Sequence, residues 1–193
     1  LEKQDNRIPL LYHSAFELVS EDLKKHLGVY SIPKYEIDFR RALTDCIFQG
    51  FSIVINRKMR DMILECDEVR CGSHDWMAML IAIEFGKYFY DGFIAAKHRR
   101  LKSSVSSLKL SSRIKWFIKM FFEESNTQKT IDEFYRIYGN RMSKQTDKKM
   151  LELFISSNRC IHTAMIKAFY PKRWRPSFVS DIAVRILMIT GKI

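Results

Sequence analysis

Apolar residues in the first hundred positions form short clustered runs interrupted by stretches of helical spacing, a pattern typical of alternating strands and helices. Residues 10–14 favour a strand that can continue to residue 19. The β-branched run at residues 51–55, bounded by Gly50 and Asn56, predicts a second strand that we expect to be buried on both faces. Helical spacing favours helices over residues 35–47 and 57–65.

The next segment, Cys71-Gly72-Ser73-His74-Asp75-Trp76, leads into a run that we expect to be a buried helix ending at Gly86. Asp75 falls in or beside the first helical turn, where free backbone N–H groups favour a carboxylate. Two interpretations stay open. Asp75 and Trp76 are either a helix cap and a core side chain, or parts of a functional site.

Residues 87–98 predict either two short extended segments around the Asp91-Gly92 turn or one last strand at residues 93–97. Residues 1–100 therefore form an α/β region. A Ser-rich basic stretch at residues 101–112 then suggests a crossing to a second region, residues 101–193, which is mainly α-helical. Its predicted helices cover residues 114–122, 130–138, 146–169 and 178–189.

Charge separates these two regions. The formal net charge of the 193-residue chain is +11. Residues 1–100 hold 15 Lys and Arg against 15 Asp and Glu, whereas residues 101–193 hold 18 against 7. The second region is thus expected to meet an anionic partner: a membrane surface, a nucleic acid or a phosphate-bearing substrate.

The four cysteines have no zinc-site spacing and suggest reduced thiols of a cytoplasmic protein. We expect no signal peptide and no transmembrane helix. The opening residues 1–4 look like the middle of a helix, so we expect the chain to be a fragment of a longer protein.

A resemblance sharpens the functional interpretation. Four pieces occur in order: Gln49-Gly50-Phe51-Ser52-Ile53-Val54-Ile55-Asn56-Arg57-Lys58, His74-Asp75-Trp76, Phe85-Gly86-Lys87 and Lys97-His98. This set resembles bacterial family 2 glycosyltransferases, and most of all the rhamnosyltransferase-like branch that builds cell-surface polysaccharides. The resemblance covers roughly residues 1–100. It implies the second, acceptor-side half of a GT-A nucleotide-diphospho-sugar transferase domain.

The resemblance also implies roles for single residues. Asp75 matches the general base of these inverting enzymes, which takes the proton from the acceptor hydroxyl. His74 would orient Asp75 or touch the donor, and Trp76 would form a wall of the acceptor pocket. The remaining matches are acceptor-side Gly50 and Phe51, His98 near the diphosphate or the metal, and Arg99 and Arg100 near the leaving group.

Some positions depart from the family pattern. Met77 replaces a second Trp, Phe51 replaces a Cys, and Lys97 stands where an Arg two residues before the His is usual. The implied cofactor is a divalent metal, Mg or Mn, whose main ligands we expect outside this chain. The implied partners are a nucleotide-sugar donor and a glycan or lipid-linked acceptor.

The basic second region has its own alternatives. In related enzymes a basic helical tail lies on the cytoplasmic leaflet, which implies a peripheral location at the inner face of the plasma membrane. Arg173, Trp174 and Arg175 are the predicted membrane contact. The same cations are equally explained as solvated faces of a helical bundle. A non-catalytic basic module for anionic membranes or nucleic acid is the alternative function, although the chain lacks a nucleic-acid recognition motif.

Overall fold

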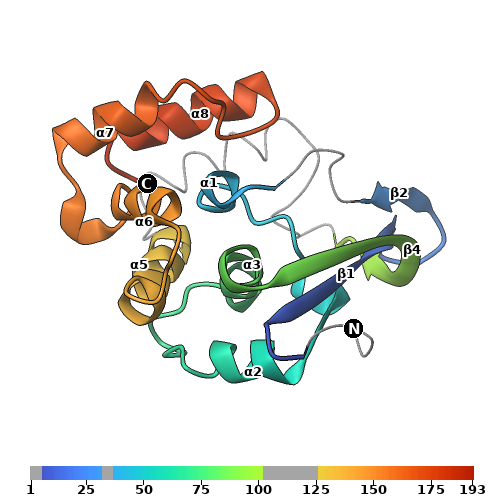
Figure 1. Cartoon of the computed structure of the whole chain (residues 1–193). Coiled ribbons are helices and arrows are strands. Elements are labelled where there is room, and N and C mark those ends of the chain that lie inside the picture. The colour runs from blue at the N-terminus through green and yellow to red at the C-terminus, as the bar shows by residue number, and fades with distance from the viewer. Residues whose placement is uncertain (1–5, 32–36, 102–125) are drawn as a thin grey trace.

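The computed structural model describes residues 6–31, 37–101 and 126–193. These residues form a mixed α/β fold with a four-stranded sheet in the N-terminal half and most of the helices in the C-terminal half (Figure 1). The predicted α/β class is confirmed at this level. The predicted helix at residues 114–122, the Ser-rich stretch from residue 102 and the opening residues 1–4 lie outside the described residues.

Strand β1 (Leu10–Val19) is the centre of the sheet and pairs with each of the other strands that the structure describes. On one edge it pairs antiparallel with β3 (Ile53–Ile55) near its start and with β2 (His26–Tyr30) near its end. On the other edge it pairs parallel with β4 (Lys87–Arg99) along its whole length. Most side chains of β1 are buried, and α2 and α3 both contact this strand.

Strand β4 differs from the prediction of two segments around a turn. The Asp91-Gly92 pair lies within one continuous strand. The register with β1 shifts after Ser14. Ser14 pairs with Asp91, but the next residue of β1, Ala15, pairs with Ile94. The Asp91 carboxylate accepts a hydrogen bond from the Phe93 backbone N–H at 2.9 Å. The residues that suggested a turn therefore form a β-bulge.

The run at residues 51–55 also departs from the prediction. Its first part belongs to a 3₁₀ turn, η1 (Gly50–Ser52), and only the following three residues form β3. Phe51 and Val54 are each about half exposed. The expected burial on both faces is wrong, because β3 occupies one edge of the sheet beside only one strand.

Helix α3 (His74–Phe85) lies at the centre of the molecule (Figure 1). Its residues from Met77 to Ala82 are all buried, and so is Glu84. Such a helix has to be covered on every side. It contacts α1 (Phe39–Ala42), α2 (Arg57–Ile63), α5 (Asn126–Tyr138) and the strands β1 and β4. The predicted buried helix is confirmed, and it ends where expected, with Gly86 as its C-cap.

The other predicted helices are confirmed in part. Helices α5 and α8 (Phe178–Ile189) lie where they were predicted, and α1 covers only a short piece of residues 35–47. The long helix predicted over residues 146–169 is wrong. It is divided into α6 (Gln145–Glu152), the 3₁₀ turn η2 (Ser156–Asn158) and α7 (Ile161–Ala168). Helix α6 ends at Glu152, and beyond this end the backbone N–H of Ser156 donates to the Asp132 carboxylate at 2.7 Å instead of making a helical hydrogen bond.

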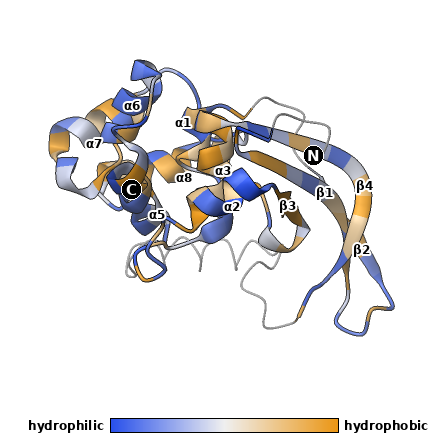
Figure 2. Ribbon diagram, turned by 60° about the horizontal axis from the view of Figure 1, so that its bottom comes forward, coloured by the Kyte–Doolittle hydropathy of each residue, from blue (hydrophilic) through white to orange (hydrophobic). Residues whose placement is uncertain are grey.

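One hydrophobic core links the sheet-bearing half to the C-terminal helices. Its buried members run from Leu11 and Phe48 to Phe134, Trp174 and Ile193. Figure 2 shows the apolar segments of α3 and α8 where the helical part meets the rest of the chain. The predicted division at residue 100 stays a prediction, but the described residues on both sides of it share this core. In the part of the chain that the structure describes, no helix is both long and apolar enough to cross a bilayer.

Gly86 tests how tightly α3 is joined to the sheet. A Cβ atom at this position would lie 1.8 Å from the backbone oxygen of Pro9, which also accepts the Lys87 N–H at 3.1 Å. We expect Gly86→Ala to lower the free energy of unfolding by about 2 kcal/mol or more, because the start of the β1–β4 ladder has to move. Urea unfolding measures this loss. Gly92→Ala is the matched control, since a Cβ at Gly92 meets nothing within 4 Å; equal losses would contradict the account.

Candidate functional site

The first turn of α3 fixes the carboxylate of Asp75. Ser73 is the N-cap, and its hydroxyl donates a hydrogen bond to Asp75 Oδ1 at 2.7 Å. The Gly50 backbone N–H donates to Asp75 Oδ2 at 3.2 Å. Asp75 is half-buried, and none of the ion pairs found among the described residues uses it. The result is an oriented carboxylate at the positive end of a helix dipole.

Gly50 lies against the first turn of α3. A Cβ atom at Gly50 would lie 3.0 Å from His74 Nε2 and 3.6 Å from Asp75 Oδ2. His74 itself is exposed. The structure thus brings together Gly50, His74 and Asp75, of which Gly50 is distant in the sequence, and all three were predicted as site residues.

Phe51 and His98 form a second group, adjacent to the first through η1. Their rings stack with centroids 4.9 Å apart, and Phe16 packs edge-on against Phe51 at 4.8 Å. Burial lowers the pKa of His98, and the nearby Arg100 lowers it further. Arg99 is exposed, whereas Arg100 is half-buried and its backbone N–H bonds to the carbonyl of Val19 at 2.8 Å. The exit of β4 therefore carries a neutral imidazole and two cations.

Trp76 has a structural contact that the sequence did not indicate. Its indole N–H donates to the backbone carbonyl of Ala42 at 2.6 Å. The ring is half-buried and packs against the core. This bond connects the beginning of α3 to the end of α1, so Trp76 positions the Asp75 turn whatever else its ring contacts.

A buried histidine next to the site was missed from the sequence. His13 of β1 is fully buried; its Nε2 lies 3.0 Å from the Ser52 hydroxyl and 3.4 Å from the Gln49 backbone nitrogen, whose N–H it accepts. Burial lowers the pKa of His13 to about 4. The neutral ring therefore holds the turn that carries Gly50. The sequence feature that could have revealed this residue is a histidine within an otherwise largely apolar predicted strand.

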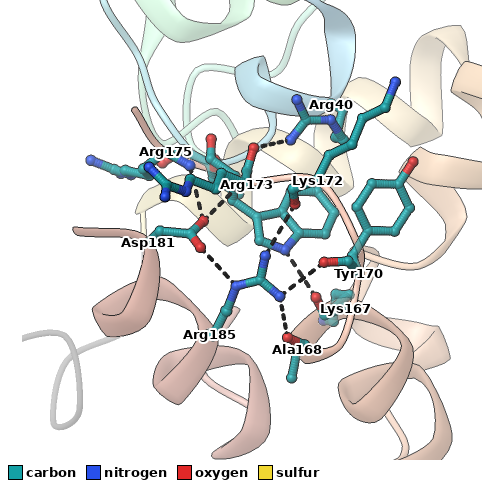
Figure 3. Close-up of polar contacts among 11 residues, drawn as sticks. Arg40, Lys167, Ala168, Tyr170, Lys172, Arg173, Arg175, Asp181 and Arg185 are labelled. Atoms are coloured by element: carbon teal, nitrogen blue, oxygen red, sulfur yellow. Dashed lines mark hydrogen bonds and ion pairs between the residues drawn. The ribbon is translucent and has the colours of Figure 1, made fainter. Parts of the chain in front are cut away.

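The basic turn at residues 170–176 is a structural junction (Figure 3). The indole of Trp174 is fully buried, and its N–H donates to the Lys167 carbonyl at 2.9 Å. Arg175 pairs with Asp45 at 3.2 Å. This arrangement contradicts the predicted membrane contact of Trp174, because a buried ring cannot reach a bilayer. Arg173 is exposed, but its carbonyl accepts a hydrogen bond from Arg40.

Arg185 and Asp181 hold this junction together from α8. The Arg185 guanidinium donates to the carbonyls of Ala168, Tyr170 and Lys172 and pairs with Asp181 at 2.8 Å (Figure 3). The Asp181 carboxylate also accepts the backbone N–H groups of Trp174 and Arg175. Burial opposes ionisation, but these hydrogen bonds leave the pKa of Asp181 below its usual value. No pattern in the sequence indicated these contacts of Arg185.

The described residues do not compose a metal site. No group of three His, Cys, Asp or Glu side chains in the described ranges could hold an ion. His98, the residue predicted to approach a metal, is flanked by the rings of Phe16 and Phe51. A single imidazole does not make a metal site, and the main ligands of the metal that the resemblance implies are expected outside this chain.

A separate hollow lies in the helical part. It has a volume of about 550 Å³ and is lined by residues of α6, η2 and α7. The lining residues include Lys149, Glu152, Arg159 and Cys160, and none of the predicted site residues. The surface at Asp75 and this hollow are thus distinct features.

Comparison with known proteins adds no family assignment. The chain matches no protein-family model, no curated protein and no solved structure.

His13 predicts a pH dependence of stability. Its pKa is 6.5 in the unfolded chain and about 4 in the folded chain, so the unfolded chain binds the extra proton between these values. Stability contributed by His13 is full above pH 6.5 and declines as the pH falls toward 4. As the pH falls from roughly 7 to 5, we expect the free energy of unfolding of His13→Gln to decrease by about 2 kcal/mol less than that of the wild type.

Denaturant unfolding at the two pH values measures this difference. His162→Gln, at an exposed position of α7, is the matched control and should retain the wild-type pH dependence. An unchanged pH dependence in His13→Gln would show that the ring is not held neutral in the folded chain.

Proposed function

We propose that this chain carries the acceptor side of an inverting glycosyltransferase, with Asp75 as the catalytic base. The observation that supports it best is the carboxylate fixed by Ser73 and Gly50 at the start of α3, half-buried and outside the ion pairs of the described residues. A base needs this combination of fixed orientation, access and freedom from a cation that would hold its electron pair. The resemblance in residues 49–58, 74–76, 85–87 and 97–98 supplies the reaction class.

In the proposed reaction Asp75 accepts the proton of the acceptor hydroxyl as its oxygen attacks the anomeric carbon of the donor sugar. The bond from that carbon to the diphosphate breaks, and the nucleoside diphosphate leaves with the electron pair. Attack from the opposite face inverts the anomeric configuration. Arg99 and Arg100, at the exit of β4, would neutralise charge on the leaving diphosphate.

The other residues would shape the acceptor side. Gly50 leaves room for His74 and for an approaching hydroxyl beside Asp75. Phe51 offers a half-exposed ring, a surface on which a sugar can pack. The nucleotide-sugar and the divalent metal implied by the resemblance would be bound mainly by parts of the protein beyond these residues. A glycan or lipid-linked acceptor at the cytoplasmic face of a membrane belongs to the same proposal.

The variant Asp75→Asn of the full-length protein tests whether Asp75 is the catalytic base. The amide keeps the shape of the side chain and can still accept the Gly50 N–H, but it cannot take a proton. We expect the rate of sugar transfer to a hydroxyl acceptor to fall by about a hundredfold or more, with unchanged affinity for the nucleoside diphosphate. Initial rates and calorimetric titration measure these two quantities.

Asp61→Asn is the matched control, because Asp61 is an exposed carboxylate of α2 that pairs only with its neighbour Arg60 among the described residues. Transfer by this variant should equal that of the wild type. Near-normal transfer by Asp75→Asn would rule out the base role, and a folded full-length protein without any transfer would remove the glycosyltransferase proposal.

A further inference from the structure

Helices α7 and α8 expose an unusual amount of apolar surface. The two helices pack against each other, and their buried residues include Ala164, Val184 and Leu187. They also carry nine exposed large apolar side chains. These are Ile161, Met165, Ile166, Phe169, Phe178, Val179, Ile182, Ile186 and Ile189, which we call the α7–α8 apolar face. Single exposed apolar residues are ordinary, but a set of this size on one helical hairpin marks an interaction surface.

The spacing of these residues places them along one side of each helix. Residues 161, 165 and 169 are four apart on α7, and residues 178, 182 and 186 repeat the spacing on α8. The two helices lie side by side at one end of the molecule, away from the sheet (Figure 1). No exposed Lys, Arg, Asp or Glu interrupts either helix, because Lys167 and Asp181 are buried and Arg185 is half-buried.

The charges that border this face are cationic. From residue 153 to residue 193 the sequence has seven Lys and Arg but one acidic residue, Asp181. Asp181 is buried and bonded to Arg185 and two backbone N–H groups. The exposed side chains of Lys172 and Arg173 lie in the turn between the helices, and the Arg173 guanidinium stands 5.6 Å from the exposed ring of Phe178. A cation thus directly borders the apolar face.

We infer that the α7–α8 apolar face docks on an anionic lipid bilayer, with its apolar side chains at the acyl boundary and Lys172 and Arg173 at the headgroups. An apolar face with a cationic border and no exposed acid between residues 153 and 193 is the composition of an interfacial membrane element. A second copy of the chain fits less well, because a symmetric contact would bring the cationic border against itself. The inference is independent of the proposed sugar transfer, since it uses none of the residues that fix Asp75.

The surface differs from the membrane contact predicted from the sequence. That prediction used Trp174 and Arg175, which face the interior and the Asp45 region. Because Trp174 is buried, the apolar part of the membrane contact consists of the exposed aliphatic and aromatic side chains of α7 and α8. The basic turn contributes Lys172 and Arg173 alone.

Vesicle co-sedimentation of the whole chain tests the inference, with phosphatidylcholine vesicles that contain or lack phosphatidylglycerol. We expect binding to the anionic vesicles that weakens as salt increases. The double variant Ile182→Ser, Ile186→Ser should bind at least about tenfold more weakly, because apolar surface no longer leaves water. Lys172→Gln with Arg173→Gln should weaken binding to anionic vesicles by about 25-fold, with little effect on neutral ones.

Leu64→Ser with Val69→Ser is the matched control, because both residues are exposed apolar side chains far along the chain from α7 and α8. It should bind like the wild type. The inference is overturned if the wild type does not bind anionic vesicles, or if the control weakens binding as much as the α8 variant. It is also overturned if light scattering shows a dimer that Ile182→Ser, Ile186→Ser dissociates while vesicle binding is absent, which would assign the face to a second copy.

Discussion

The burial of α3 is the constraint on which the rest of the fold depends. A helix that is apolar on all sides gains stability only when every side is covered, and here strands, short helices and α5 share that task. Its C-terminal end is fixed by the tight passage of Gly86 beside Pro9. The one exposed residue of α3 is His74, in the N-terminal turn. The position of Asp75 is therefore a consequence of how the core is packed.

Buried polar groups then join the peripheral pieces to this centre. His13 holds the Gly50 turn against β1, while Trp76 bonds to α1. On the helical side, Arg185 satisfies three backbone carbonyls and the Asp181 carboxylate, so the turn that carries Trp174 has a fixed path. A buried polar group without such partners would cost about 1–3 kcal/mol, so each of these contacts favours one arrangement of the chain. The same network removes Trp174 from the surface and leaves the outer sides of α7 and α8 uncovered by described residues.

The spacing of apolar residues correctly predicted those helices whose position depends mainly on nearby residues in the sequence. The apolar run before Gly86 correctly predicted α3, and residues 178–189 matched α8. The failures share a cause, which is that tertiary contacts override local signals. Asp91-Gly92 is absorbed in a bulge because β1 offers a long partner. The helix predicted over residues 146–169 ends at Glu152, and the Ser156 N–H that follows bonds to Asp132.

For the site, the order of motifs brought Gly50, His74 and Asp75 to attention, and these residues do meet. Periodicity could not show which side of α8 would face water, because Val184, Leu187 and Met188 compete with Ile182 and Ile186 for the core. Nor could it show the burial of Trp174, which requires Arg185 from a helix that comes later in the chain. Information of this kind resides in contacts between distant residues.

Native-state hydrogen exchange tests most directly whether α3 organises one core that fixes the Asp75 turn. We predict that amides of α3 from Met77 to Ala82 exchange only through global unfolding, together with those of β1 and the buried side of α5. The Gly50 amide should also be protected, and Asp75→Ala should remove that protection alone. Free exchange at Gly50 in the wild type, or early exchange of α3 while the C-terminal helices stay protected, would contradict this picture of the core.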